Sequence, residues 1–261
     1  MVNPDRGIGF HGGVKLIPKP IQWRNAKSGS VIFGSANRSV LFGAMGPRHE
    51  VNIGYDFQIS EAPVSVEQVR NLQERLGAEL ASESEWELAY SQGLLIAEEG
   101  EIEVFPDSAN SYWGKKCDGR PFLKGSKFPQ ISREWKDGKP TPSLSRPSSD
   151  SQSDFPELSS DCKVRLVVRN QKKWSEKSPK LPEYADTSRI IGEEILISLI
   201  VGIIPSFAWA YYNAAPSYLA EGWINLTLGG LFIGILSGLF WRPLQPTWIV
   251  IEGKMSSSHK D

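Results

Sequence analysis

Two long uncharged runs in the last third of the chain constrain its fold more than any other feature. The first, 195–212, is almost entirely apolar, and the second, 222–241, contains no Asp, Glu, Lys or Arg. A helix rises ~1.5 Å per residue, so each run can cross a ~30 Å hydrocarbon layer, the first near the short limit. We therefore predict a transmembrane hairpin of two helices within residues 191–242.

Small residues recur at four-residue steps along both runs. On the first run they are Ser198, Gly202 and Ser206, and on the second run they are Gly230, Gly234 and Gly238. Small side chains at this spacing let helix backbones approach closely, which favours association where lipid supplies no hydrophobic driving force. We expect the two helices to pack on each other through these residues, or to use one such face for an oligomer or a protein partner.

The charged residues around the two runs predict their orientation. The connection 213–221 has no Lys or Arg, whereas the segments before the first run and after the second contain both. The positive-inside rule then places both termini in the cytoplasm. Met1–Gly13 lacks the apolar stretch of a signal peptide, so we expect no translocation of the preceding domain. The prediction is a two-pass integral membrane protein with the lipid bilayer as a partner and a cytoplasmic tail over 243–261.

The preceding part, residues 1–170, is predicted to be a soluble α+β domain. Short strands are expected over 14–17 and 31–35. A longer strand is expected over 51–59, where every second residue is apolar, as in a half-buried strand. A last strand over 162–169 is expected to return to the same sheet and close the domain.

A short helix with a recognisable start and end lies within Leu80–Gly93. Ser82 can serve as its N-cap, and Glu85, three residues on, can complete a capping box. Trp86 begins an apolar face at helical spacing, and Gly93 suits a left-handed end. We therefore predict that one Trp-bearing helix occupies the centre of the soluble domain.

The remaining segments of the domain have weaker signals. A helix is expected from Ser65 to Gly77. Residues 98–139 are rich in aromatic residues and Gly, and we expect irregular structure there. The Ser-, Pro- and Asp-rich stretch 141–161 is predicted to be a mobile loop, and 171–190 a polar linker. A net charge of −1 gives no global field that would favour nucleic acid.

The helix motif also resembles a known family. The segment Leu80–Tyr90 resembles the Leu-Pro-Thr-Glu-Ala-Glu-Trp-Glu-Tyr-Ala-Ala motif of the formylglycine-generating enzyme family, the sulfatase-modifying factor domain. Segments 31–35, 47–51 and 57–65 resemble upstream family motifs in the family's order, and 162–169 resembles its closing strand. The resemblance implies a C-type-lectin-like α+β fold with much irregular structure. The positions that carry this fold signature are His49, Pro63, Ser82, Glu85 and Trp86.

The sequence departs from the family where the family's chemistry resides. The Gly-Asn-Val-Trp-Glu-Trp motif is not found, and no closely spaced cysteine pair occupies the position of the family's copper ligands. The two cysteines, Cys117 and Cys162, can form a thiolate copper site only if the fold brings them together. Without that, no catalytic residue, metal or cofactor is predicted, and reduced thiols fit a cytoplasmic domain.

Three functions remain open from the sequence. The first is a non-catalytic binding or scaffold module tethered to the cytoplasmic face of a membrane, since a fold does not imply its family's activity. The second is a divergent formylglycine-generating oxidase that uses Cys117, Cys162 and copper. The third is a small membrane subunit whose helical hairpin assembles into a larger complex.

Overall fold

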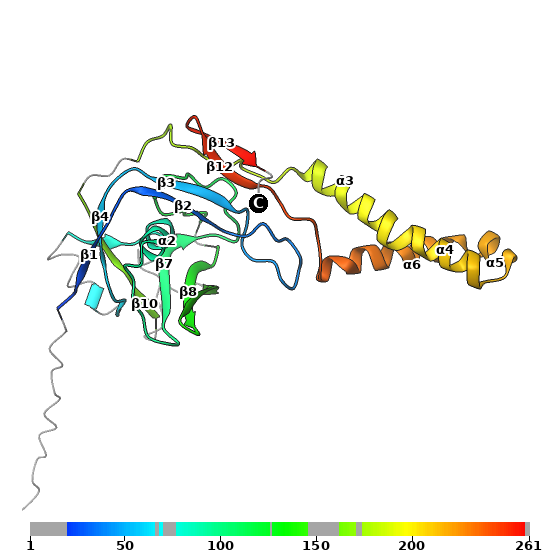
Figure 1. Cartoon of the computed structure of the whole chain (residues 1–261), viewed down its shortest axis with the longest axis horizontal. Helices are drawn as coiled ribbons and strands as arrows, with labels where there is room; N and C mark the ends of the chain where they lie inside the picture. Colours follow the sequence, from blue (N-terminus) through cyan, green and yellow to red (C-terminus); the bar gives the residue numbers. More distant parts are fainter. Residues whose placement is uncertain are drawn as a thin grey trace, which may run out of the picture.

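The fold combines a mixed α+β domain with a helical projection over residues 187–239 (Figure 1). The computed structural model describes residues 20–65, 68–69, 77–125, 127–145, 162–170 and 174–258. The α+β class predicted from the sequence is confirmed. The strand expected over 14–17, almost all of the helix expected after Ser65, and most of the loop expected over 141–161 lie outside these residues.

The strands of the domain form three sheets. The first contains, in order, β1 (Trp23–Ala26), β4 (Phe57–Ser60), β11 (Leu166–Arg169) and β6 (Glu79–Leu80). The second contains β5 (Val64–Ser65), β10 (Cys162–Val164), β7 (Ile102–Ser108), β8 (Gln130–Lys136) and β9 (Lys139–Ser145). The third contains β13 (Lys254–Ser258), β12 (Thr247–Ile251), β3 (His49–Ile53) and β2 (Gly29–Phe33).

Two of the predicted strands are each divided between sheets. The single strand expected over 51–59 is wrong, because the chain bends after Ile53 and continues as β4 in a different sheet. The bend is stabilised by Asp56, whose carboxylate accepts the Ser28 amide at 2.8 Å. Likewise, the strand expected over 162–169 is interrupted at Arg165, so only β11 pairs with β4. Alternation predicted burial correctly but could not reveal the change of partner.

The expectation of irregular structure over 98–139 is wrong at both ends of that stretch. β7 and β8 are each seven residues long and pair antiparallel, and β9 pairs with β8. Consecutive positions of β8 on both of its faces are buried, and they include the polar Ser132 and Arg133. This strand therefore lacks the apolar alternation by which strands are recognised in a sequence.

Helix α2 (Glu83–Ser91) forms the centre of the domain, as predicted. Ser82 and Glu85 make the reciprocal capping box, which confirms the predicted helix start, and Gly93 has a φ of +69° just beyond the end. The Trp86 ring is fully buried and stacks on Tyr90, with ring centroids 5.3 Å apart. The large buried area of this aromatic cluster stabilises the core.

The polar segment that follows β11 packs against the domain. The side chain of Leu181 is 1% exposed, and its amide donates to the Lys115 carbonyl at 2.9 Å. The Pro179 carbonyl accepts the Cys117 amide at 2.7 Å. Within the predicted linker, 171–190, the segment 174–186 therefore packs against the domain, and helix α3 already begins at Thr187.

The tail after the second apolar run is part of the domain. β12 and β13 pair with each other, and β12 joins β3 in parallel with Trp248 opposite His49. The described part of the predicted tail, 243–258, thus contributes two strands to the domain. Because the chain leaves the domain before α3 and returns at β12, both ends of the projection are fixed to one domain.

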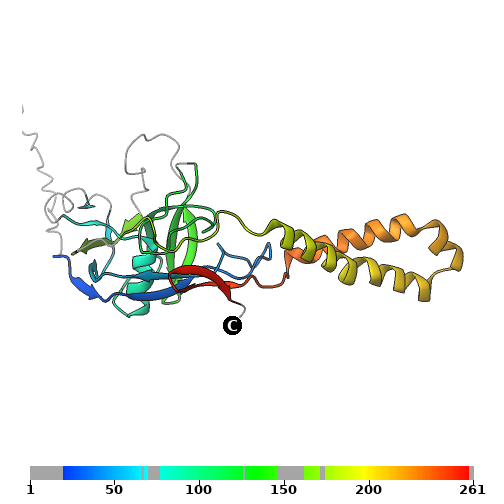
Figure 2. The ribbon, with the colours of Figure 1, turned by 90° about the horizontal axis from the view of Figure 1, so that it is seen from above.

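The projection begins with one continuous helix, Thr187–Asn213, formed by α3 (Thr187–Ile197), the π-helical η1 (Ser198–Ile203) and α4 (Ile204–Asn213). Pro205, which has no amide hydrogen to donate, lies just after the π-helical segment. The chain returns through α5 (Pro216–Glu221), α6 (Trp223–Leu236) and η2 (Ser237–Leu239). We call 187–213 the first arm and 216–239 the second arm. Both views show the two arms side by side (Figures 1 and 2).

Thr187–Asn213 is long and apolar enough to cross a membrane. Its mean hydropathy is 2.0 over its best window, and only 17% of that window is buried. Among the described residues no other helix meets the same length, since Trp223–Leu239 is shorter. One predicted span thus has the required length and composition.

Four of the six predicted small residues lie where the two arms meet. A Cβ on Gly230 would lie 2.6 Å from Ile203 Cα, and one on Gly234 would lie 2.6 Å from Ser198 Cα. A Cβ on Gly202 would overlap the Gly230 carbonyl. The predicted contact within the chain is therefore present at Ser198, Gly202, Gly230 and Gly234.

The two outermost positions of the stripes differ from this pattern. Gly238 does not face the first arm, because a Cβ there would overlap the guanidinium of Arg242. The Ser206 hydroxyl donates to the Gly202 carbonyl of its own helix at 2.9 Å. The small-residue contact is therefore concentrated around η1 and the middle of α6.

Candidate functional site

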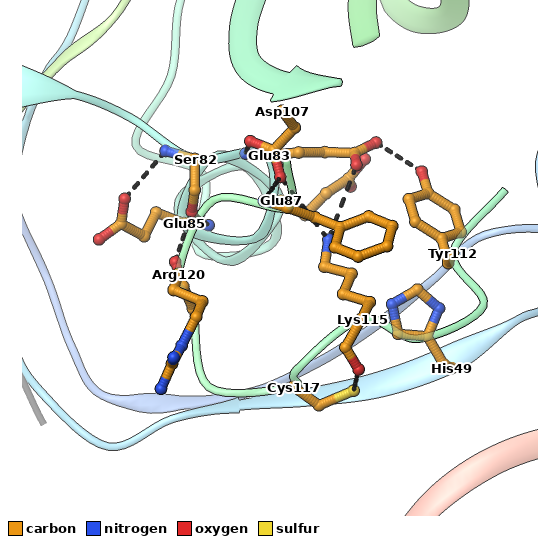
Figure 3. A network of polar contacts seen from close by, with 12 residues as sticks. His49, Ser82, Glu83, Glu85, Glu87, Asp107, Tyr112, Lys115, Cys117 and Arg120 are labelled. Atoms are coloured by element: carbon orange, nitrogen blue, oxygen red, sulfur yellow. Dashed lines mark hydrogen bonds and ion pairs between the residues drawn. The ribbon is translucent and has the colours of Figure 1, made fainter. Parts of the chain in front are cut away.

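A buried network of charged side chains lies at the N-terminus of α2 (Figure 3). Glu83 accepts hydrogen bonds from Tyr112 Oη at 2.7 Å and from Arg133 Nη2 at 2.5 Å. Arg133 also donates to Glu87 at 2.7 Å. Asp107 accepts the Glu83 amide at 2.9 Å, which satisfies one of the free amides of the helix start. The network therefore joins α2 to β7 and β8.

Lys115 occupies the middle of this network and is 0% exposed. Its Nζ lies 3.8 Å from Glu83 Oε2 and 3.9 Å from Asp107 Oδ1, which are ion-pair distances. The same Nζ lies 4.6 Å from the centre of the Phe33 ring and 5.0 Å from that of Tyr112. Cation–π contacts of this kind offset part of the cost of burying an ammonium group.

Burial shifts the titration of the groups around Lys115. Desolvation raises the pKa of Asp107 to about 6, against the lowering effect of Lys115. It lowers the pKa of His49 to about 3, with the Lys115 charge acting in the same direction. His49 is thus neutral near neutral pH, and its Nδ1 lies 2.9 Å from the Pro47 carbonyl oxygen.

An open cavity of about 900 Å³ lies on one side of this network. Tyr112 and Arg133 belong both to the network and to the cavity wall, so they separate the buried charges from solvent. The wall also includes Asn110 and the exposed Arg48. The Arg48 side chain forms no hydrogen bond or ion pair with any described residue. The cavity therefore offers amide and guanidinium donors to a polar or anionic ligand.

The two cysteines are buried and lie in different parts of the fold. Cys117 lies beside β3, where its carbonyl accepts the Asn52 amide, and Cys162 begins β10 in another sheet. Burial raises the pKa of Cys117 to about 12, and its Sγ lies 3.8 Å from the Lys115 carbonyl. A thiolate, the form that binds copper, is strongly disfavoured there. Across the described residues no cluster of three or more His, Cys, Asp or Glu side chains has the geometry of a metal site.

The residues of the predicted fold signature contribute to the core around α2. Glu85 completes the capping box and also accepts two hydrogen bonds from Arg169, both at 2.6 Å. The Ser82 hydroxyl also donates to the Gly119 carbonyl at 2.6 Å. Trp86 donates through Nε1 to Glu103 at 2.7 Å. His49 is fully buried at the start of β3, and Pro63 lies half-buried just before β5.

The carboxylates at the start of α2 are not solvated. Glu83 and Glu85 are fully buried and ion-paired. Sequence reasoning missed their partners, which lie far away along the chain. The nearest signal was the cluster of acidic residues in the helix motif, and this does not distinguish a buried carboxylate from a solvated one.

The base of the projection carries a second group of ion pairs. Glu193 pairs with Arg38, which follows β2, and Glu194 accepts from Arg242 Nε at 2.8 Å. Arg242 also donates to the Gly234 and Ile235 carbonyls. The first pair fixes the first arm to the domain, and the Arg242 contacts join the first arm to the end of the second.

Comparison with known proteins adds no relative to this description. No family model, no curated protein and no solved structure matches the chain.

Proposed function

We propose that this chain is an integral membrane protein whose domain is a non-catalytic binding module of the sulfatase-modifying factor type. The observation that carries the proposal is the exposed apolar surface of a projection whose two ends are both fixed to the domain. A helix in a soluble core would bury that surface. A bilayer makes its exposure favourable, because lipid tails are as apolar as the side chains themselves.

In this proposal both arms of the projection span the membrane as a hairpin. Aromatic side chains support this arrangement, because they are exposed at the two ends, where interfacial Trp and Tyr are favoured. At the far end they are Trp209, Tyr211, Tyr212, Tyr218 and Trp223, and at the base Phe240 and Trp241. The absence of Lys and Arg from the far connection favours a cytoplasmic position for the domain.

The cavity beside Tyr112 is the proposed ligand site. Binding is preferred to catalysis because the ionisable groups behind its wall are buried and engaged with one another. Lys115 is inaccessible, Cys117 is protonated, and His49 is neutral and buried. A substrate reacts only with groups that it can contact. The groups that a ligand can contact in this cavity are amide and guanidinium donors, which suit binding rather than catalysis. A C-type-lectin-like fold, which the sequence resemblance implies, belongs to the same proposal.

Membrane fractionation tests the location of the chain. The full chain should stay in the membrane pellet after alkaline extraction, as should Ile32→Lys, which adds a charge to the exposed face of β2. Ile200→Lys with Ile233→Lys, at side chains 56% and 50% exposed on the projection, should weaken insertion. Release of the unmodified chain into the soluble fraction would contradict the proposal.

Crosslinking from membranes tests the binding role. Arg48→Glu reverses the charge of the cavity wall, and Lys136→Glu makes the same change at an exposed position of β8. Products of the parent should persist in Lys136→Glu and disappear in Arg48→Glu. Equal product patterns in all three proteins would remove the cavity from the proposal.

A further inference from the structure

The loop between β2 and β3 exposes three consecutive apolar side chains. Val40, Leu41 and Phe42 are 71%, 57% and 65% exposed. Both views place this loop beside the end of α6 that is nearest to the domain (Figures 1 and 2). Three large exposed apolar residues in sequence are unfavourable in water and favour contact with an apolar phase.

The loop is attached to the end of the second arm by backbone hydrogen bonds. The Val40 amide donates to the Gly238 carbonyl, and the Leu41 amide donates to the Leu239 carbonyl, both at 3.0 Å. The loop therefore has a defined position relative to the apolar arm, and it continues the arm's apolar surface toward the domain.

The other amides between Ser39 and Gly43 are satisfied by the loop itself. The Ser39 amide donates to Asn37 Oδ1 at 2.9 Å, and the Phe42 amide donates to Ser39 Oγ at 3.3 Å. The Gly43 amide donates to the Ser39 carbonyl at 2.9 Å. Asn37 Nδ2 in turn donates to the Phe42 carbonyl at 3.1 Å. All five amides from 39 to 43 thus have partners within the protein, which is what a backbone in contact with lipid requires.

The length of the second arm leaves room for this contact. α6 has 14 residues and η2 has 3, which together extend about 25 Å, whereas the hydrocarbon layer is ~30 Å thick. The chain after η2 continues with exposed Phe240, Trp241 and Leu244. The loop is bonded to the end of this arm that is nearest to the domain, so it adds apolar surface at that level.

The charges nearby are already paired, so they do not oppose such contact. Glu193 is bound by Arg38 and by Arg189, and Glu194 is bound by Arg242. Paired carboxylates are far less costly near lipid than isolated ones.

We propose that Val40, Leu41 and Phe42 insert into the interfacial layer of the bilayer on the domain's side. The domain is then seated on the membrane by its own loop as well as by the two arms, and the occupant of this apolar surface is lipid. This inference rests on the proposed membrane location of the projection.

Site-specific labelling of the full chain in nanodiscs tests the inference. Phe42→Cys, Ile233→Cys and Ile96→Cys each add one exposed thiol, while Cys117 and Cys162 are buried, and the unsubstituted chain measures background labelling. An environment-sensitive fluorophore on each thiol is read in the presence and absence of brominated lipid chains. Ile96 is the aqueous control, because it lies on the side of the domain near β1, away from the projection (Figure 1). Its amide donates to the carbonyl of Glu61, which pairs with Arg24 of β1.

The expected result is a blue-shifted emission that brominated lipid quenches at Phe42 and at Ile233, with neither effect at Ile96. Lipid contact at Ile233 together with an aqueous signal at Phe42 would overturn the inference and leave the proposed function intact. Aqueous signals at both positions would overturn both.

Discussion

Glu103 is a fully buried carboxylate that connects three parts of the domain. It accepts Nε1 of Trp86 and of Trp135, each at 2.7 Å. It also accepts Arg165 Nε at 2.6 Å and Arg165 Nη2 at 2.7 Å, and both side chains of this ion pair are 0% exposed. Each of the two carboxylate oxygens of Glu103 therefore accepts two hydrogen bonds.

Glu103→Gln keeps the shape of the side chain but removes its charge. The new amide nitrogen would face donors, and the Arg165 guanidinium would remain buried without a counter-ion. Removing one partner of a buried ion pair costs about 3–5 kcal/mol. Arg165 also donates to the Ser60, Glu61 and Ile96 carbonyls, which favours the lower limit. For a chain of this size, about 3 kcal/mol lowers the melting temperature by about 6–12 °C.

Thermal unfolding in detergent, followed by tryptophan fluorescence, measures this effect, because Trp86 and Trp135 both contact the substituted group. The matched control is Glu134→Gln, since Glu134 forms a more exposed pair with Lys136 at 2.9 Å. Exposed pairs contribute about 0–1 kcal/mol, so this control should unfold nearly with the parent. Equal melting temperatures for Glu103→Gln and Glu134→Gln would refute the view that the Arg165 pair organises the core.

Two further predictions concern the arms and the buried histidine. Gly202→Ala should destabilise the chain in detergent by about 1–3 kcal/mol through overpacking, whereas Gly229→Ala, with open space around it, should not; equal melting temperatures would contradict the helix contact. Burial lowers the pKa of His49 to about 3, so the folded state binds fewer protons than the unfolded chain, and stability is lost as the pH falls from 6.5 toward 3. His49→Gln should reduce this loss in urea titrations across that range, and an unchanged pH dependence would contradict the assignment.

The elements that could be predicted are those whose signals are local. The capping box of Ser82 and Glu85 lies within four residues, and the structure contains it. The contact at Gly202, Gly230 and Gly234 follows from spacing on two neighbouring arms. The network around Lys115 could not be predicted. The sequence does not show whether a charged residue is buried or solvated until its partners are known.

The sequence by itself determined the start and end of helix α2, the burial of alternating residues over 51–59, and a helix apolar enough to cross a membrane. These properties depend on side-chain chemistry and on neighbours a few residues away. Only the tertiary structure decided the bend after Ile53, the pairing of Glu103 with Arg165, and the return of β12 to β3. Those features depend on contacts between residues far apart along the chain, whose closure entropy is offset only when the whole domain assembles.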